Sequence, residues 1–159
     1  MTTTHTIVRS TTAERLADGP TSTLTLLVDG EHTTGATTIN RAHLAAGSPG
    51  APAHRHENAT ETIFVISGSL DVLVDNTVHT LLAGDLVFLA AGTAHAFAPT
   101  PGLEADMLAI YTPGQERFAY YRMLEQLHLG EVTLADLQAT SDRFDNHYVD
   151  SPAWRASRA

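Results

Sequence analysis

The stretch from Thr21 to Thr112 constrains the fold most, because it is a succession of short apolar segments separated by turn-forming residues. The segments are rich in β-branched or apolar residues and read TLTLLV, ATTINRAHLA, ETIFVIS, SLDVLV, VHTLLA, DLVFLA, HAFA and EADMLAIYT. The separators are DG, GSPG, SG, DN, AG and TPG. Many short strands at close, regular spacing are typical of a β-sandwich or a small barrel. We therefore predict an all-β domain here.

The apolar pattern changes after Pro113 and Gly114, where its period becomes helical. QERFAYYRMLEQLHLG ends at Gly130 and carries one apolar stripe, formed by Phe118, Tyr121, Leu124 and Leu127. A second helix is predicted from Thr133 through TLADLQATSDRF, with Asp136 three residues on as the capping partner. The segment after the all-β domain is therefore predicted to be a two-helix extension.

Three parts follow from these patterns. Residues 1–20 are rich in threonine, end in DGP and are predicted to form an N-terminal arm. Residues 21–112 form the barrel, and residues 113–159 form the C-terminal helical extension. A chain of 159 residues suits one domain with a core of its own.

The composition excludes several kinds of chemistry. The chain has no cysteine, which removes disulfides and thiolate ligands, and no lysine, which removes Schiff-base catalysis. A net charge of −9 argues against a nucleic-acid partner and against an anionic membrane surface. The N-terminus lacks the apolar core of a secretory signal, and no apolar run is long enough to span a membrane. We expect a cytoplasmic protein.

A group of histidines with one carboxylate suggests a metal site. His54 and His56 point the same way if they lie on a strand, and Glu61 can join them if the intervening residues turn back. His95 follows in GDLVFLAAGTAHAFAP, where an antiparallel neighbour would bring it opposite the first pair. Three imidazole nitrogens and one carboxylate suit Fe, Mn, Ni, Co, Cu or Zn. Taken as a fragment, HxH followed by Glu is equally compatible with histidines in a surface loop.

The spacing of these residues resembles the first motif of the cupins, G(x)5-6HxH(x)3-4E(x)6G. Here Gly47 is followed by six residues and His54-Arg-His56. Four residues then precede Glu61, and six more lead to Gly68. The resemblance covers residues 21–112 and implies an all-β cupin jelly-roll barrel with the metal inside. It also implies that the ligands are His54, His56, Glu61 and His95.

The second cupin motif, G(x)5PxG(x)2H(x)3N, is present with two departures. Gly84, Gly92 and His95 stand at the expected spacing, but Ala90 replaces the usual proline and Pro99 the usual asparagine. Both departures concern turn rigidity and not ligation. Fifteen residues separate Gly68 from Gly84, which suits small bacterial cupins.

Within the cupins, the single barrel with a helical tail resembles bacterial quercetinase-like monocupins. This resemblance implies a metal-dependent dioxygenase that opens a flavonol or a similar enolisable aromatic compound with dioxygen. Glu61 is then the candidate catalytic base that removes the substrate's hydroxyl proton. Two alternatives remain open, namely a metal-assisted polyketide cyclase or isomerase that needs no oxygen, and a cupin that only binds a small molecule.

The predicted substrate pocket is apolar. Ile63 and Val65 share a strand face with Glu61, and Phe97 shares a face with His95, so we predict that these three residues contact the substrate. An apolar pocket suits an aromatic or polyketide-like molecule, and the sequence shows no arginine cluster for a phosphate. The resemblance to cupins also leads us to expect a homodimer.

Overall fold

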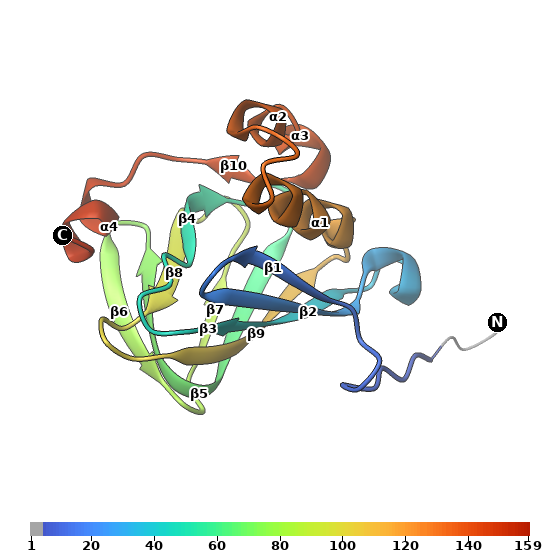
Figure 1. Ribbon diagram of the computed structural model, residues 1–159, viewed down its shortest axis with the longest axis horizontal. Coiled ribbons are helices and arrows are strands. Elements are labelled where there is room, and N and C mark those ends of the chain that lie inside the picture. Colours follow the sequence, from blue (N-terminus) through green and yellow to red (C-terminus); the bar gives the residue numbers. More distant parts are fainter. Residues whose placement is uncertain (1–4) are drawn as a thin grey trace.

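The computed structural model describes residues 5–159, and within this range ten strands form one curled antiparallel sheet (Figure 1). The sheet order is β1-β2-β3-β9-β5-β8-β4-β10, and β6 and β7 also pair with β5. The strands are β1 Arg15–Gly19, β2 Ser22–Val28, β3 Thr38–Leu44, β4 Ala51–Arg55, β5 Thr60–Val74, β6 Thr77–Leu82, β7 Leu86–Leu89, β8 His95–Pro99, β9 Ala105–Thr112 and β10 His147–Tyr148. The predicted all-β jelly-roll barrel is confirmed.

Strand β5 joins the two halves of the barrel. Its first half pairs with β7 and β9, and its second half pairs with β6 and β8. The strand bends near Gly68, whose φ of 79° lies in the left-handed region that favours glycine. A Cβ atom at this position would lie 2.0 Å from the carbonyl oxygen of Glu104. Gly68 therefore allows the close backbone approach at the bend that closes the sheet on itself.

The interior of the barrel is mainly aliphatic, and aromatic residues join it on the side of the C-terminal extension. Fully buried side chains include Ile63, Val65, Leu70, Val72 and Met107. Tyr111, Phe118, Tyr120 and Tyr121 belong to the same core cluster. The extension is therefore packed into the core of the domain.

The extension contains more elements than the sequence predicts. After the short 3-10 helix η1 (Gly30–Thr33) in the barrel, the helices are α1 Arg117–His128, α2 Leu134–Gln138, α3 Ser141–Phe144 and α4 Pro152–Ser157. Helix α1 and the Thr133–Asp136 capping pair are confirmed. The second predicted helix is wrong in its length, because it breaks between α2 and α3. There the hydroxyl of Thr140 donates to the carbonyl of Leu137, a local bond that competes with helix continuation.

The N-terminal boundary also differs from the prediction. Strand β1 lies inside the segment predicted as an arm and pairs with β2, where Leu16 is opposite Leu24. Leu16 is buried, and the backbone N–H of Ala17 donates to the side chain of Glu125 on α1. The pattern around Leu16 offers only one large apolar residue, so its pairing depends on the barrel and on α1.

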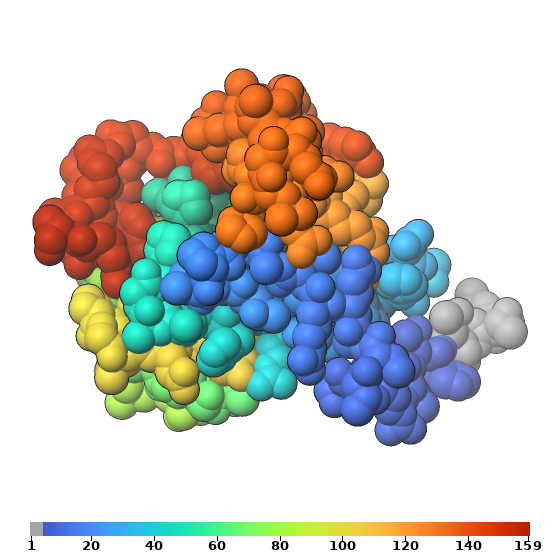
Figure 2. Space-filling view, viewed as in Figure 1, coloured from blue at the N-terminus to red at the C-terminus, as the bar shows by residue number. Residues whose placement is uncertain are grey.

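The extension lies over one end of the barrel. Figure 2 shows its orange and red residues packed above the blue residues of β1 and β2. Among the described residues, no helix is both long and apolar enough to cross a membrane. A tight hairpin joins β5 to β6, and Asp75 in its turn adopts the left-handed conformation.

Candidate metal centre

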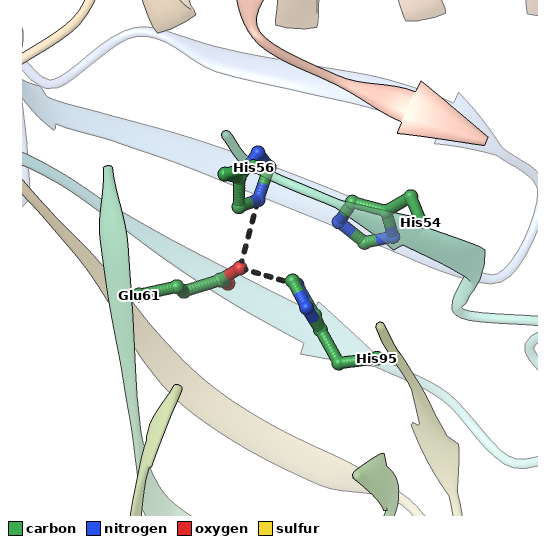
Figure 3. A group of neighbouring side chains, drawn as sticks. All are labelled: His54, His56, Glu61 and His95. Carbon is green, nitrogen blue, oxygen red and sulfur yellow. Dashed lines mark hydrogen bonds and ion pairs between the residues drawn. The ribbon is translucent and has the colours of Figure 1, made fainter. Parts of the chain in front are cut away.

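Three neighbouring strands bring the four predicted ligands together (Figure 3). His54 lies on β4, opposite His95 at the start of β8, and Glu61 lies on β5. His56 follows β4 directly. One ligand atom from each residue lies within 4.8 Å of those of the other three, and all four side chains are buried. The convergence expected from the sequence is therefore present.

Backbone carbonyls fix the orientation of all three imidazoles. The Nδ1 atoms of His54, His56 and His95 lie 2.7, 2.6 and 2.9 Å from the carbonyl oxygens of Pro52, Asp145 and Thr93, respectively. A carbonyl oxygen only accepts, so each Nδ1 carries a hydrogen and each Nε2 points inward, where it donates when the ring is protonated and can bind a cation when the ring is neutral. This arrangement, a histidine held by a carbonyl at its outer nitrogen, is the one found around protein-bound metals.

The carboxylate of Glu61 is held by three donors. Its Oε2 lies 3.1 Å from Nε2 of His56 and 2.8 Å from Nε2 of His95, and its Oε1 accepts from the hydroxyl of Tyr111 at 3.1 Å. Burial opposes a charge on this group, yet the bonds from the two histidines hold its pKa well below its usual range. Burial lowers the pKa of His54 well below its usual value. Glu61 is therefore ionised and His54 neutral at neutral pH.

The four donors fit a divalent transition metal ion. When all three rings are neutral, their inward Nε2 lone pairs and the carboxylate repel one another unless a cation lies between them. Each histidine has one inward lone pair, and Glu61 supplies the single negative charge. Nitrogen and oxygen donors in this ratio suit Fe, Mn, Ni, Co, Cu or Zn and do not distinguish among these metals.

A cavity of about 480 Å³ borders the centre. His54 and Tyr111 belong to its wall, and the remaining wall is mostly apolar. The apolar residues include Leu24, Ala42, Leu44, Phe97, Ala109, Leu124, Leu127 and Leu137. Residues of α1, α2 and β10 line it together with residues of the barrel. The extension therefore forms part of the cavity wall.

Only one of the three predicted substrate contacts lies at this cavity. Phe97 lines it, whereas Ile63 and Val65 are fully buried in the core and are not among the lining residues. The reason is that both side chains pack into the hydrophobic core cluster of the barrel. We keep the substrate-binding prediction for Phe97 alone.

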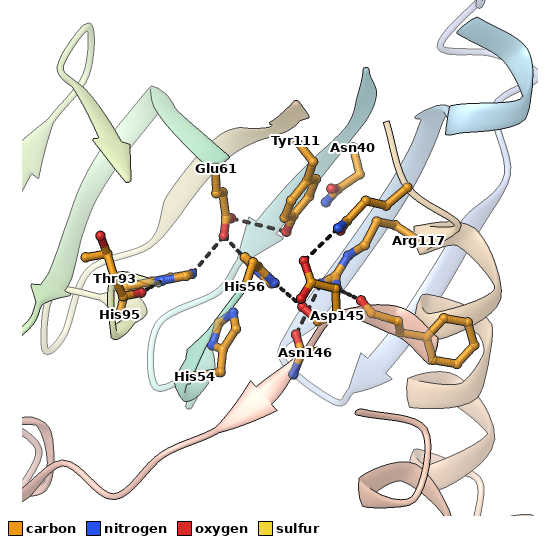
Figure 4. Close-up of polar contacts among 12 residues, drawn as sticks. Asn40, His54, His56, Glu61, Thr93, His95, Tyr111, Arg117, Asp145 and Asn146 are labelled. Atoms are coloured by element: carbon orange, nitrogen blue, oxygen red, sulfur yellow. Dashed lines mark hydrogen bonds and ion pairs between the residues drawn. The ribbon is translucent and has the colours of Figure 1, made fainter. Parts of the chain in front are cut away.

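The sequence analysis missed a group of polar residues on the extension side of the cavity, drawn in part in Figure 4. We name it the tyrosine–arginine wall, and it consists of Tyr111, Arg117, Tyr120, Tyr121 and Asn146. The guanidinium of Arg117 lies 4.7 Å from the ring centre of Tyr111 and 4.5 Å from that of Tyr120. Burial and the nearby carboxylate of Glu61 raise the pKa of Tyr111 well above its usual value. Apart from the apolar stripe of α1, no pattern in the sequence predicts this wall.

The wall reaches the metal centre through a chain of hydrogen bonds. The hydroxyl of Tyr121, which lies 2.8 Å from Oδ1 of Asn40, donates to the hydroxyl of Tyr111 at 3.1 Å, and Tyr111 donates to Glu61. Tyr111 stands directly opposite Glu61 on the paired strands β9 and β5. The cross-strand pair could have been found only once the register of these two strands was known.

Comparison with known proteins agrees with this geometry. Residues 40–111 match the family model of the cupin domain. No curated protein matches the sequence. The structure of KdgF from Halomonas sp. is similar at a TM-score of 0.62 and 13% identity, covering 71% of this chain and 99% of that one.

Two further structures are similar. An RmlC-like cupin from Shewanella frigidimarina has a TM-score of 0.62 and 18% identity, covering 74% of this chain and 99% of its own. Streptomyces Pac13, a nucleoside dehydratase, was solved with uridine; in that form it has a TM-score of 0.57 and 18% identity, with coverage of 73% and 88%. At these identities the likeness concerns the fold.

The fold and the site define a class, a small antiparallel barrel that buries three histidines and one glutamate beside a cavity. The match to the cupin domain model covers residues 40–111, and the similar solved structures share the fold of this part of the chain. The resemblance to cupins stated from the two motifs is confirmed.

Proposed function

We propose that this protein is a metal-dependent enzyme that cleaves a flavonol or a similar enolisable aromatic compound with dioxygen. The observation that carries the proposal is a buried set of three inward histidine nitrogens and one carboxylate at the wall of a largely apolar cavity of about 480 Å³. His54, His56, Glu61 and His95 would hold one divalent ion. A cavity of this size and character suits an aromatic molecule of two or three rings.

The bound ion would acidify the substrate's hydroxyl and, if it is redox-active, exchange electrons with dioxygen. The proton itself would pass to the carboxylate of Glu61. Because the pKa of Glu61 lies well below its usual range, the carboxylate is available as an acceptor at neutral pH. Tyr111, which lines the cavity, donates to Oε1 of Glu61 and would hold that carboxylate in place.

The apolar wall would exclude water and hold the substrate plane. Leu24, Leu44 and Phe97 line the cavity on the barrel side, and Leu124 and Leu137 line it from the extension. A reactive enolate survives longer in such an environment, since fewer water molecules can return its proton. The positions of these side chains therefore support a reaction that proceeds through an electron-rich intermediate of the substrate.

A second candidate is a metal-assisted polyketide cyclase or isomerase that uses no oxygen. The chain of hydrogen bonds from Asn40 through Tyr121 and Tyr111 to Glu61 favours it, because such a chain can move a proton between two substrate atoms. In either case the substrate is an aromatic or polyketide-like small molecule. The homodimer and the cytoplasmic location stay predictions.

Oxygen uptake with quercetin tests the first candidate. We would load the protein separately with nickel, manganese, cobalt, iron and zinc, and compare it with Glu61→Gln and with Glu57→Gln, which changes an exposed carboxylate nearby. Uptake that needs flavonol and metal should fall at least about a hundredfold in Glu61→Gln, the range of general-base catalysis. Glu57→Gln should behave as the wild type. Absence of uptake with every metal would reject flavonol cleavage and favour the second candidate.

A further inference from the structure

Arg117 is a buried cation in the wall of the cavity. It is the first residue of α1, its exposed fraction is 2%, and it lines the cavity together with Asn146. Its guanidinium stacks on the rings of Tyr111 and Tyr120, as described above. A charged side chain this deeply buried is uncommon unless another group compensates it.

The hydrogen bonds of Arg117 and Asn146 leave donors unused. Nη1 of Arg117 donates to the carbonyl of Phe144 at 3.0 Å, and Nη2 donates to Oδ1 of Asn146 at 3.3 Å. Within residues 5–159, however, Nε of Arg117 and Nδ2 of Asn146 are buried without a partner. Two neighbouring residues of one wall therefore each offer a free N–H group. Buried donors of this kind are normally satisfied, so a ligand oxygen is the natural acceptor.

The charge of Arg117 also favours the binding of an anion. In the described part of the chain, six other arginines form ion pairs, and Arg117 forms none. The faces of the tyrosine rings stabilise the cation only in part. A divalent ion held by the single carboxylate of Glu61 would leave the metal centre positive as well. The carboxylate of Asp29 accepts the backbone N–H groups of Arg117 and Phe118, but it does not line the cavity and forms no ion pair with the guanidinium.

The one carboxylate in the cavity wall lies elsewhere. Asp18 belongs to β1, where the adjacent Ala17 contacts Glu125 on the second half of α1. Arg117 begins the same helix eight residues earlier, which corresponds to about 12 Å along its axis. The two charges of the cavity wall are therefore separated along α1. The guanidinium of Arg117 lies at the start of the helix, and the carboxylate of Asp18 lies near its second half.

We propose that Arg117 and Asn146 form an oxyanion-binding subsite, which selects substrates carrying a carboxylate or an ionised phenol beside the metal centre. The guanidinium stacks on the ring of Tyr111, and the hydroxyl of that ring contacts Glu61, so the anionic group would lie about one tyrosine ring from the reacting part of the substrate. From the proposed function we take only that the reacting part lies at the metal centre. Arg117 and Asn146 are then residues that determine specificity.

Calorimetric binding to the metal-loaded, full-length protein tests the subsite. The probes are 2-naphthoate against its neutral isostere 2-naphthamide, and 4-nitrophenol at mildly alkaline pH, where it is ionised, against 4-nitroanisole. At least one anion should bind at least about tenfold more tightly than its neutral counterpart, as expected for a hydrogen bond between charged groups. The pair that shows the preference identifies the carboxylate or the phenolate as the ligand group. Equal binding within both pairs would overturn the proposal.

Variants show whether the preference comes from the subsite or from the metal. Asn146→Asp keeps the stacked guanidinium and gives it a permanent counter-charge, and Arg117→Gln removes the cation. Both should abolish the preference for the anion while the metal content stays that of the wild type. Arg122→Gln, which changes an exposed arginine on the same helix, should retain it.

A preference that survives Asn146→Asp and Arg117→Gln in folded protein would place the anion on the metal and overturn the subsite. Melting curves of each variant identify any protein that has failed to fold, and Asn146→Asp then carries the test because it leaves Arg117 in place. Failure of oxygen uptake together with a normal preference for the anion would reject only the proposed reaction.

Discussion

The metal centre and the tyrosine–arginine wall lie on two sides of one cavity, and they are encoded in different ways. The ligands of the centre come from two short segments, His54 to Glu61 and the region of His95. The wall joins Tyr111 on β9 to Arg117 on α1 and Asn146 near β10, so its side chains meet only after the extension has packed. The comparison teaches that the candidate metal centre is local in sequence, whereas the wall that we propose to select a substrate is assembled by the tertiary fold.

The two regions are physically joined through Asp145. Its backbone carbonyl accepts from Nδ1 of His56, and its side chain accepts from the backbone N–H groups of Glu57 and Asn58 at 2.7 and 2.9 Å. Asp145, the left-handed residue that ends α3 with a φ of 51°, thus directs both its carbonyl and its carboxylate to residues 56–58 of the barrel. The extension therefore orients one predicted metal ligand as well as forming the cavity wall.

Removing the extension should have the largest effect on this comparison. A chain ending after Pro113 would expose the core residues that contact α1 and would leave His56 without its carbonyl partner. We expect little soluble, folded protein, as judged by yield and circular dichroism. A soluble barrel that melts like the full chain and retains its metal would instead mean that the extension only covers the cavity.

Asp145→Ala should have the next largest effect. The change removes the carboxylate that accepts from the part-buried backbone N–H groups of Glu57 and Asn58, which should lower the free energy of unfolding by about 1–3 kcal/mol. The affinity for metal should fall by up to about tenfold, because the backbone carbonyl of residue 145 is then held less firmly against Nδ1 of His56. Chemical denaturation and metal titration measure the two quantities.

Asp142→Ala is the matched control for that change, because Asp142 is exposed in the same segment. It should alter the stability by less than about 0.5 kcal/mol. If Asp145→Ala were as mild as Asp142→Ala, the metal centre would be independent of the extension.

Glu14→Gln should have the smallest effect and tests a contact outside both regions. A hydrogen bond from Arg122 is the main cause that lowers the pKa of Glu14. Because the pKa of Glu14 is lowered in the folded state, the pair with Arg122 stabilises the fold above the usual glutamate pKa. This stabilisation is lost as the pH falls. We expect a loss below about 1 kcal/mol at neutral pH and none in acid. An equal loss at both pH values, measured by urea denaturation, would contradict this origin.

The sequence predicted the barrel and the ligands because both depend on local patterns. Alternating apolar residues and turn glycines define the strands, and the spacing from Gly47 to Gly68 places the ligands on neighbouring segments. Gly68 in particular is required by a positive φ and a close backbone contact. Each of these requirements can be recognised from a single residue in the sequence.

The remaining features depend on pairings that a single sequence does not reveal. The pairing of β1 needs α1 beside it, and the contact between Tyr111 and Glu61 needs the register of β9 with β5. Ile63 and Val65 share the face of Glu61, as predicted. Their side chains are buried in the core, however, and do not line the cavity. Face alternation alone does not distinguish a core residue from one that lines a cavity.

The metal content of His54→Ala tests the central claim most directly. The variant would be purified beside the wild type and beside His79→Ala, which changes an exposed histidine on β6, and each would be titrated with zinc and nickel. We expect one ion per chain in the wild type and in His79→Ala. In His54→Ala the affinity should fall by more than about a hundredfold, beyond the range for orienting partners alone, while the barrel stays folded. Full occupancy in folded His54→Ala would contradict the assignment of this cluster as the metal centre.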